Sequence, residues 1–112
     1  MSAVYVSNLI INAGSTFSQD FDLGSTEDNA PFNLDGYTIS AQLRKHSASS
    51  KSTDFESVIV DPGNGLINVA LAATTTASIK PGRYVYDIVV TTGDIKTRVV
   101  EGSALVREGV TQ

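Results

Sequence analysis

The side chains that could take part in chemistry are few in this sequence and lie far apart. The one histidine, His46, follows Arg44 and Lys45 and precedes a serine-rich stretch. A general base needs a partner that orients it and shelter from bulk water, and the residues around His46 suggest neither. The pattern therefore favours a solvated histidine over a surface contact, and a surface contact over a catalyst.

Carboxylates offer a second candidate site. Asp20 and Asp22 flank an apolar residue on the polar side of an expected strand, and Glu27 and Asp28 follow in the next loop. Two carboxylates at this spacing can begin a calcium site, but the regular spacing of a calcium loop is missing. The pattern favours a charged, solubilising strand face, so we predict no metal site here.

Nucleophiles and cofactor motifs are not indicated either. The chain has no cysteine, which removes disulfides, thiolate chemistry and cysteine metal ligands together. The serines form no nucleophile elbow, and the glycines form no phosphate-binding loop. We therefore predict a protein that is not an enzyme, with no catalytic residue and no cofactor.

One local basic patch stands out on an acidic chain of net charge −4; it consists of Arg44, Lys45, His46 and Lys51. Most such clusters of basic residues are only solvated and bind no partner. The alternative is an electrostatic contact with an acidic neighbouring subunit. Because the acidic residues are spread along the chain, a surface that neutralises phosphates is not expected, and we predict no nucleic-acid partner.

The elements that must carry these residues are strands. A chain of 112 residues forms one domain, residues 1–112, and its charged fraction of 18% is below the roughly 25% of an average domain. Apolar and polar residues alternate over short runs, with turn residues about every ten positions. This predicts an all-β, antiparallel sandwich of seven or eight strands. The opening residues predict a strand, not a signal peptide or a membrane span.

The expected order of elements follows from these runs. The expected strands are 4–12, 16–23, 37–45, 55–60, 66–71, 83–92 and 94–107, with loops at 24–36 and 46–54 and a crossover at 72–80 that could form a helical turn. Gly102 could mark a β-bulge. Val4, Val6, Leu9 and Ile11 do not share one phase. This predicts a first strand that is covered on both faces, swapped onto a neighbour's sheet edge, or ordered on assembly.

The stretch PGRYVYDIVV, residues 81–90, predicts a central strand of the core. Tyr84, Tyr86, Ile88 and Val90 share one face at a period of two. Gly82 and Tyr84 have the spacing of the immunoglobulin-type corner, in which the tyrosine hydroxyl bonds a backbone group just upstream. Tyr86 then takes the place that antibody domains give to a cysteine. We therefore expect the sandwich to be immunoglobulin-like.

Three stretches in this order resemble small β-sandwich modules of tailed-phage particles: FNLDGYTISAQLRK, DPGNGLINVAL and ASIKPGRYVYDIVVTTGDIKTRVVEGSALV. They resemble in particular the N-terminal immunoglobulin-like domain of phage baseplate upper proteins. Structural proteins of myoviruses that infect marine cyanobacteria carry similar modules. The similarity covers roughly residues 16–107.

The resemblance implies a virion structural protein, either a capsid decoration or a tail or baseplate component, assembled in the host cytoplasm. Its partners would be other virion proteins, with a homo-oligomer as a further expectation and no membrane. The alternative is a glycan-binding or host-adhesion module that uses loops 24–36 and 46–54. An exposed aromatic residue in those loops would favour this alternative, and Phe32 is the candidate.

Overall fold

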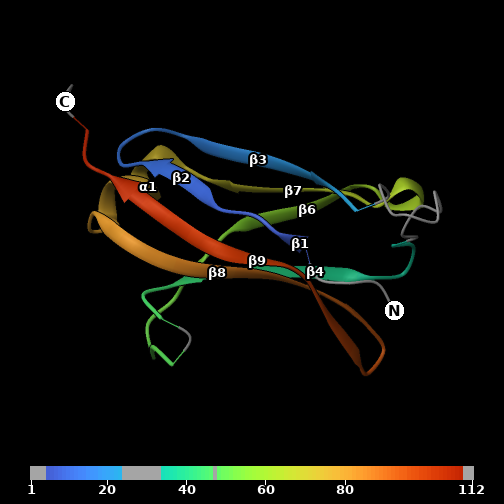
Figure 1. Cartoon of the computed structure of the whole chain (residues 1–112). Helices are drawn as coiled ribbons and strands as arrows, with labels where there is room; N and C mark the ends of the chain where they lie inside the picture. Colours follow the sequence, from blue (N-terminus) through green and yellow to red (C-terminus); the bar gives the residue numbers. More distant parts are fainter. Residues whose placement is uncertain (1–4, 24–33, 47, 110–112) are drawn as a thin grey trace.

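The computed structural model describes residues 5–23, 34–46 and 48–109, which form two facing layers of strands (Figure 1). The larger sheet has the order β1 (Tyr5–Val6), β9 (Ile95–Arg107), β8 (Gly82–Thr92), β4 (Thr38–Arg44) and β5 (Thr53–Asp54), and β2 (Leu9–Asn12) also pairs with β9. The smaller sheet has the order β3 (Phe17–Asp22), β7 (Leu66–Leu71) and β6 (Glu56–Asp61). The helical pieces are η1 (Pro62–Asn64) and α1 (Ala73–Ser78). No helix in these ranges is long and apolar enough to cross a membrane.

The strand order is that of an immunoglobulin-like sandwich, which confirms the predicted fold class. The sheet β3–β7–β6 corresponds to immunoglobulin strands B, E and D, and β9–β8–β4 corresponds to G, F and C. Two details differ from the prediction. The described residues form nine strand segments, two of them only two residues long. In addition, β1 and β2 pair with β9 in parallel, so the larger sheet is mixed.

The alternation of apolar residues places the core between the sheets as predicted. In β8, Tyr86, Ile88 and Val90 are buried, and Tyr84 packs against the core beside them. In β4, Ala41 and Leu43 are buried at the same period. Successive side chains of a strand point to opposite faces, so a short alternating run is enough to identify the inner face.

Within the described residues, the first predicted strand, 4–12, is not covered on both faces; that it is swapped or ordered on assembly stays a prediction. It forms β1 and β2, which lie along the outer edge of β9 of the same chain. Leu9 and Ile11 point inward, whereas Val6 and Ile10 are 73% and 57% exposed. The segment is therefore covered on one face only. Val6 and Leu9 are three positions apart, an odd spacing, and lie on opposite faces.

The β-bulge in β9 is at Val99, so the prediction of a bulge at Gly102 is wrong. Ile88 pairs with Val100 and Val89 pairs with Arg98, which leaves Val99 as the extra residue. Val99 and Val100 are both buried, and a regular strand cannot turn two successive side chains inward. The bulge thus lets the Val-Val step place both side chains in the core.

The crossover 72–80 contains the predicted helical turn, α1, and one buried polar side chain. The Thr76 hydroxyl accepts a hydrogen bond from the Gly14 backbone N–H at 3.0 Å and donates one to the Ser15 carbonyl at 2.8 Å. Because Thr76 is fully buried, these bonds satisfy a hydroxyl that would otherwise be costly to remove from water. They also fix α1 to the turn between β2 and β3.

The loop predicted at 46–54 includes a short strand that the sequence did not indicate. Thr53 and Asp54 form β5, which pairs with Leu43 and Gln42 of β4. The backbone N–H of Phe55 then donates to the Ala41 carbonyl at 3.0 Å, and the Phe55 side chain is buried. The chain therefore crosses from the larger to the smaller sheet at Phe55.

Candidate functional site

The predicted basic patch lines an open hollow beside the loop that follows β4. Arg44, Lys45, His46 and Lys51 line it together, as their closeness in sequence suggested. Lys80 joins them from the segment between α1 and β8, and sequence reasoning missed this residue. We call this site the cationic hollow; its volume is about 810 Å³.

Tyr84, the tyrosine of the predicted corner, lines the cationic hollow. The Tyr84 hydroxyl donates a 2.6 Å hydrogen bond to the carbonyl oxygen of Lys80, four residues upstream, which is the geometry of a tyrosine corner. Lys45 Nζ lies 5.0 Å from the centre of the Tyr84 ring, within the range of a cation–π contact. The Lys45 Nζ atom would also be 3.0 Å from a Cβ atom placed on Gly82, so a side chain at position 82 would crowd the ammonium group.

Tyr86 holds the N-terminal segment against β9. Its hydroxyl donates a 2.6 Å hydrogen bond to the Ser7 carbonyl, and Gly102 pairs with Tyr86 on the neighbouring strand. Next to this bond, the Asn8 Oδ1 atom accepts hydrogen bonds from the backbone N–H and the hydroxyl of Ser103, at 3.1 and 3.0 Å. The place that antibody domains give to a cysteine thus carries a polar link within the larger sheet.

Replacing Tyr86 by phenylalanine tests this link and gives a specific dependence on pH. Burial raises the pKa of the Tyr86 phenol above its usual value of 10.0. Above pH 10 the unfolded state therefore loses its proton before the folded state does, and the free energy of unfolding falls as the pH rises. We expect Tyr86→Phe to lower the free energy of unfolding by about 1–2 kcal/mol at pH 8, because the Ser7 carbonyl loses its partner.

The measurement is urea unfolding of both proteins at pH 8, 10 and 11. The stability advantage of the wild-type protein should shrink as the pH rises, because the variant lacks the phenol that ionises. A constant difference at all three values would show that the Tyr86 phenol does not titrate differently in the two states.

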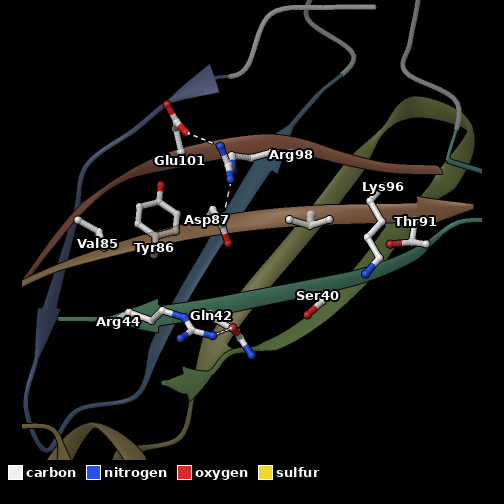
Figure 2. A pocket seen from close by; sticks show the side chains of 11 residues that line it. Ser40, Gln42, Arg44, Val85, Tyr86, Asp87, Thr91, Lys96, Arg98 and Glu101 are labelled. Carbon is white, nitrogen blue, oxygen red and sulfur yellow. Dashed lines mark hydrogen bonds and ion pairs between the residues drawn. The ribbon is translucent and has the colours of Figure 1, made fainter. Parts of the chain in front are cut away.

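The outer face of the larger sheet holds a second hollow, of about 620 Å³, lined by side chains of β4, β8 and β9 (Figure 2). Arg98 lies at the upper edge of this hollow. Its Nε atom is 3.1 Å from Asp87 Oδ2, and its Nη1 atom is 3.5 Å from Glu101 Oε1. Arg44 donates to Gln42 Oε1 at 2.8 Å and to the Ser49 carbonyl. Arg98, Asp87 and Glu101 are therefore paired with one another, whereas the partners of Arg44 are uncharged.

Two carboxylates of the calcium hypothesis, Asp20 and Asp22, lie on the outer face of the smaller sheet. Asp20 accepts a 2.6 Å hydrogen bond from the Asn68 side chain and is exposed, as is Asp22. Glu27 and Asp28 lie outside the described residues. Among the residues that the structure describes, no group of three or more histidine or carboxylate side chains could hold a metal ion.

The loops proposed for glycan binding are described in part. Most of loop 24–36, including Phe32, lies outside the described residues. Beside loop 46–54, the ring of Tyr84 lines the cationic hollow, and Lys45 lies over it. His46 is exposed at the start of this loop, and its backbone N–H donates to the Ser49 hydroxyl at 3.1 Å.

Comparison with known proteins supports the fold. No protein-family model and no curated protein matches the sequence. Among solved structures, the chain is similar to InlP of Listeria monocytogenes, with a TM-score of 0.51 and 16% identity over 90% of this chain. It is less similar to a family 123 glycoside hydrolase from Clostridium perfringens, with a TM-score of 0.39 and 16% identity over 99% of this chain. The chain spans about a quarter of each of these proteins, 26% and 24%.

Proposed function

We propose that this protein is a non-enzymatic structural protein of a phage particle, part of a capsid decoration, tail or baseplate. It acts by contacts with neighbouring virion proteins. The observation that carries the proposal is an apolar stripe on the outer face of the larger sheet, formed by Ile10, Leu105 and Val85. The resemblance to β-sandwich modules of tailed-phage particles supplies the kind of partner.

The apolar stripe runs across three adjacent strands. Ile10 and Leu105 are direct partners in the β2–β9 pair, and Val85 pairs with Ser103, two residues before Leu105 in β9. The three apolar side chains are 57%, 36% and 38% exposed. The direct partner of Leu105 in β8 is Arg83, so Val85 is its diagonal neighbour on this face. Scattered apolar residues are ordinary on a surface, but neighbours on one sheet face offer an area that a partner could cover.

The surroundings of the apolar stripe suit a protein contact. Val85 also lines the polar hollow of Figure 2, so the stripe passes directly into a region of hydroxyl, amide and charged side chains. Protein interfaces commonly combine an apolar centre with a polar rim. The ion pairs of Arg98 with Asp87 and Glu101 fix the charges of that rim in place.

Particle incorporation tests the proposal. We expect mass spectrometry of purified particles from the phage that encodes this chain to find it in many copies. A variant with Ile10→Lys and Leu105→Lys should be incorporated at least about tenfold less, because two lysines would have to be desolvated in the contact. Both side chains are exposed, so its thermal midpoint should stay close to that of the wild-type protein.

The matched control places the same charges on the other sheet. Val58→Lys with Val60→Lys changes two side chains of β6 that are 55% and 53% exposed, and it should be incorporated normally. Particles that never contain the chain would refute the virion role. Equal loss in both variants would refute the role of the apolar stripe.

A further inference from the structure

The cationic hollow is locally opposite in charge to the rest of the protein. Four of the eight lysines and arginines line it, namely Arg44, Lys45, Lys51 and Lys80, together with His46. None of its lining residues is an aspartate or a glutamate. Since the whole chain has a net charge of −4, subtracting these four positive charges leaves −8 for the remainder.

Two cations of the hollow, Arg44 and Lys45, are held in position without being neutralised. Arg44 is fixed by the Ser49 carbonyl and the Gln42 side chain, and Lys45 rests on the Tyr84 ring. These partners are uncharged. Within the described parts of the chain, the salt bridges belong to Arg98, at the other hollow. The cluster thus keeps its positive charge available to an outside group.

We propose that the cationic hollow binds a carboxylate-rich extended segment of a neighbouring protein. The inference rests on the proposed function, because it names the chemistry of one partner of the particle protein. Besides the cations, the hollow presents hydroxyl groups that can donate to carboxylates, those of Ser49, Ser50, Ser52 and Thr53. Hydrogen bonds between charged groups are stronger than neutral ones, and several cations in one hollow favour a ligand with several anionic groups.

The contacts of the Tyr84 ring and the openness of the hollow favour an acidic peptide over an acidic sugar as the ligand. Sugars usually stack on an exposed aromatic face, and the ring at this site, that of Tyr84, has Lys45 over it and its hydroxyl bonded to the Lys80 carbonyl. The hollow has a volume of about 810 Å³ and is open to solvent, as a segment passing across it requires. In Figure 1 the segment between β4 and β5 (green) projects away from both sheets, so an incoming chain can reach it.

The overall negative charge does not prevent such binding. At physiological salt, charges are screened beyond about 8 Å, so a bound carboxylate responds mainly to the nearest cations. These are the side chains of the hollow. The contact should weaken as salt rises, because its charges are exposed.

The experiment is fluorescence anisotropy with a labelled hexaglutamate peptide and the full chain, at low and at physiological salt. We expect saturable binding, and the triple variant Lys45→Gln, Lys51→Gln and Lys80→Gln should raise the Kd by about tenfold or more. The matched control is Arg83→Gln, Lys96→Gln and Arg107→Gln, which removes the same charge from exposed positions outside the hollow. Its Kd should change less than about threefold.

The other outcomes overturn the proposal. An equal loss in both triple variants would show a response to net charge alone. Binding of polygalacturonate without binding of hexaglutamate would assign the hollow to an acidic glycan. No binding of hexaglutamate at low salt would show that the cationic hollow does not bind acidic peptides. If hexaglutamate does not bind but the chain is found in particles, the proposed function stands and this inference fails. If hexaglutamate binds but the chain is absent from particles, the hollow binds acidic peptides and the proposed function fails.

Discussion

Replacing Gly102 by valine should lower the free energy of unfolding by about 3 kcal/mol, and the thermal midpoint by roughly 10–20 °C. A Cβ at Gly102 would lie 2.0 Å from the carbonyl oxygen of Ser7 and 2.8 Å from its carbon. Both atoms belong to the backbone, so a flexible side chain cannot simply swing away. The N-terminal segment must leave β9, and the hydrogen bond from Tyr86 to Ser7 is lost with it.

The matched control is Gly63→Ala in η1. Its new Cβ would lie 3.9 Å from the nearest atom, Asp61 Oδ1, and its backbone is not left-handed, so we expect a change within about 0.5 kcal/mol. Hydrogen exchange supplies a second readout, because Gly102→Val should lose protection mainly in β1 and β2. Equal stability of the two variants would mean that Ser7 does not pack on Gly102.

Gly102 shows why a glycine within a strand is hard to interpret from sequence. Such a glycine marks either a bulge or a site where another backbone comes close. The predicted feature at Gly102 is a bulge, but the structure places the bulge at Val99 and the backbone of Ser7 at Gly102. Choosing correctly requires knowing that residue 7 lies beside residue 102, a pairing that no local pattern indicates.

Local patterns predicted the parts of the fold that depend on local geometry. The inner faces of β4 and β8 followed from period-two alternation, and β7 has the predicted bounds, Leu66–Leu71. The turn before β7 contains Gly65 with a φ of 71°, a conformation in which glycine is favoured. Side-chain direction and turn chemistry involve neighbours in sequence, so they can be read without knowledge of the fold.

The cationic hollow contains residues whose proximity follows from the local sequence and one residue whose proximity does not. Arg44, Lys45, His46 and Lys51 lie within eight positions of one another, so their proximity was predictable. Lys80 joins them because its carbonyl oxygen is bonded to Tyr84, whose ring is in contact with Lys45. Its contribution depends on the β4–β8 pairing. The parallel pairing of the N-terminal segment was missed for the same reason, since it joins residues more than ninety positions apart.

Phe55 carries the second large predicted effect, because its ring joins the two sheets. The centre of the ring lies 6.1 Å from that of Phe17 in β3 and 6.2 Å from that of Tyr86 in β8. These separations are in the range of favourable aromatic pairs, and the Tyr86 contact is edge-to-face. In a chain without cysteine, this aromatic trio stands where an immunoglobulin domain has its inter-sheet disulfide.

Replacing Phe55 by alanine should therefore lower the free energy of unfolding by about 3–5 kcal/mol, as measured by urea unfolding. The substitution leaves a cavity between the sheets and removes both ring contacts at once. Phe55→Leu retains most of the volume and should lose only about 1–1.5 kcal/mol. Val58→Ala, at a side chain that is 55% exposed, should be nearly neutral. If Phe55→Ala were no more destabilising than Phe55→Leu, the space between the sheets would have to close without the ring, and the trio would not be what joins them.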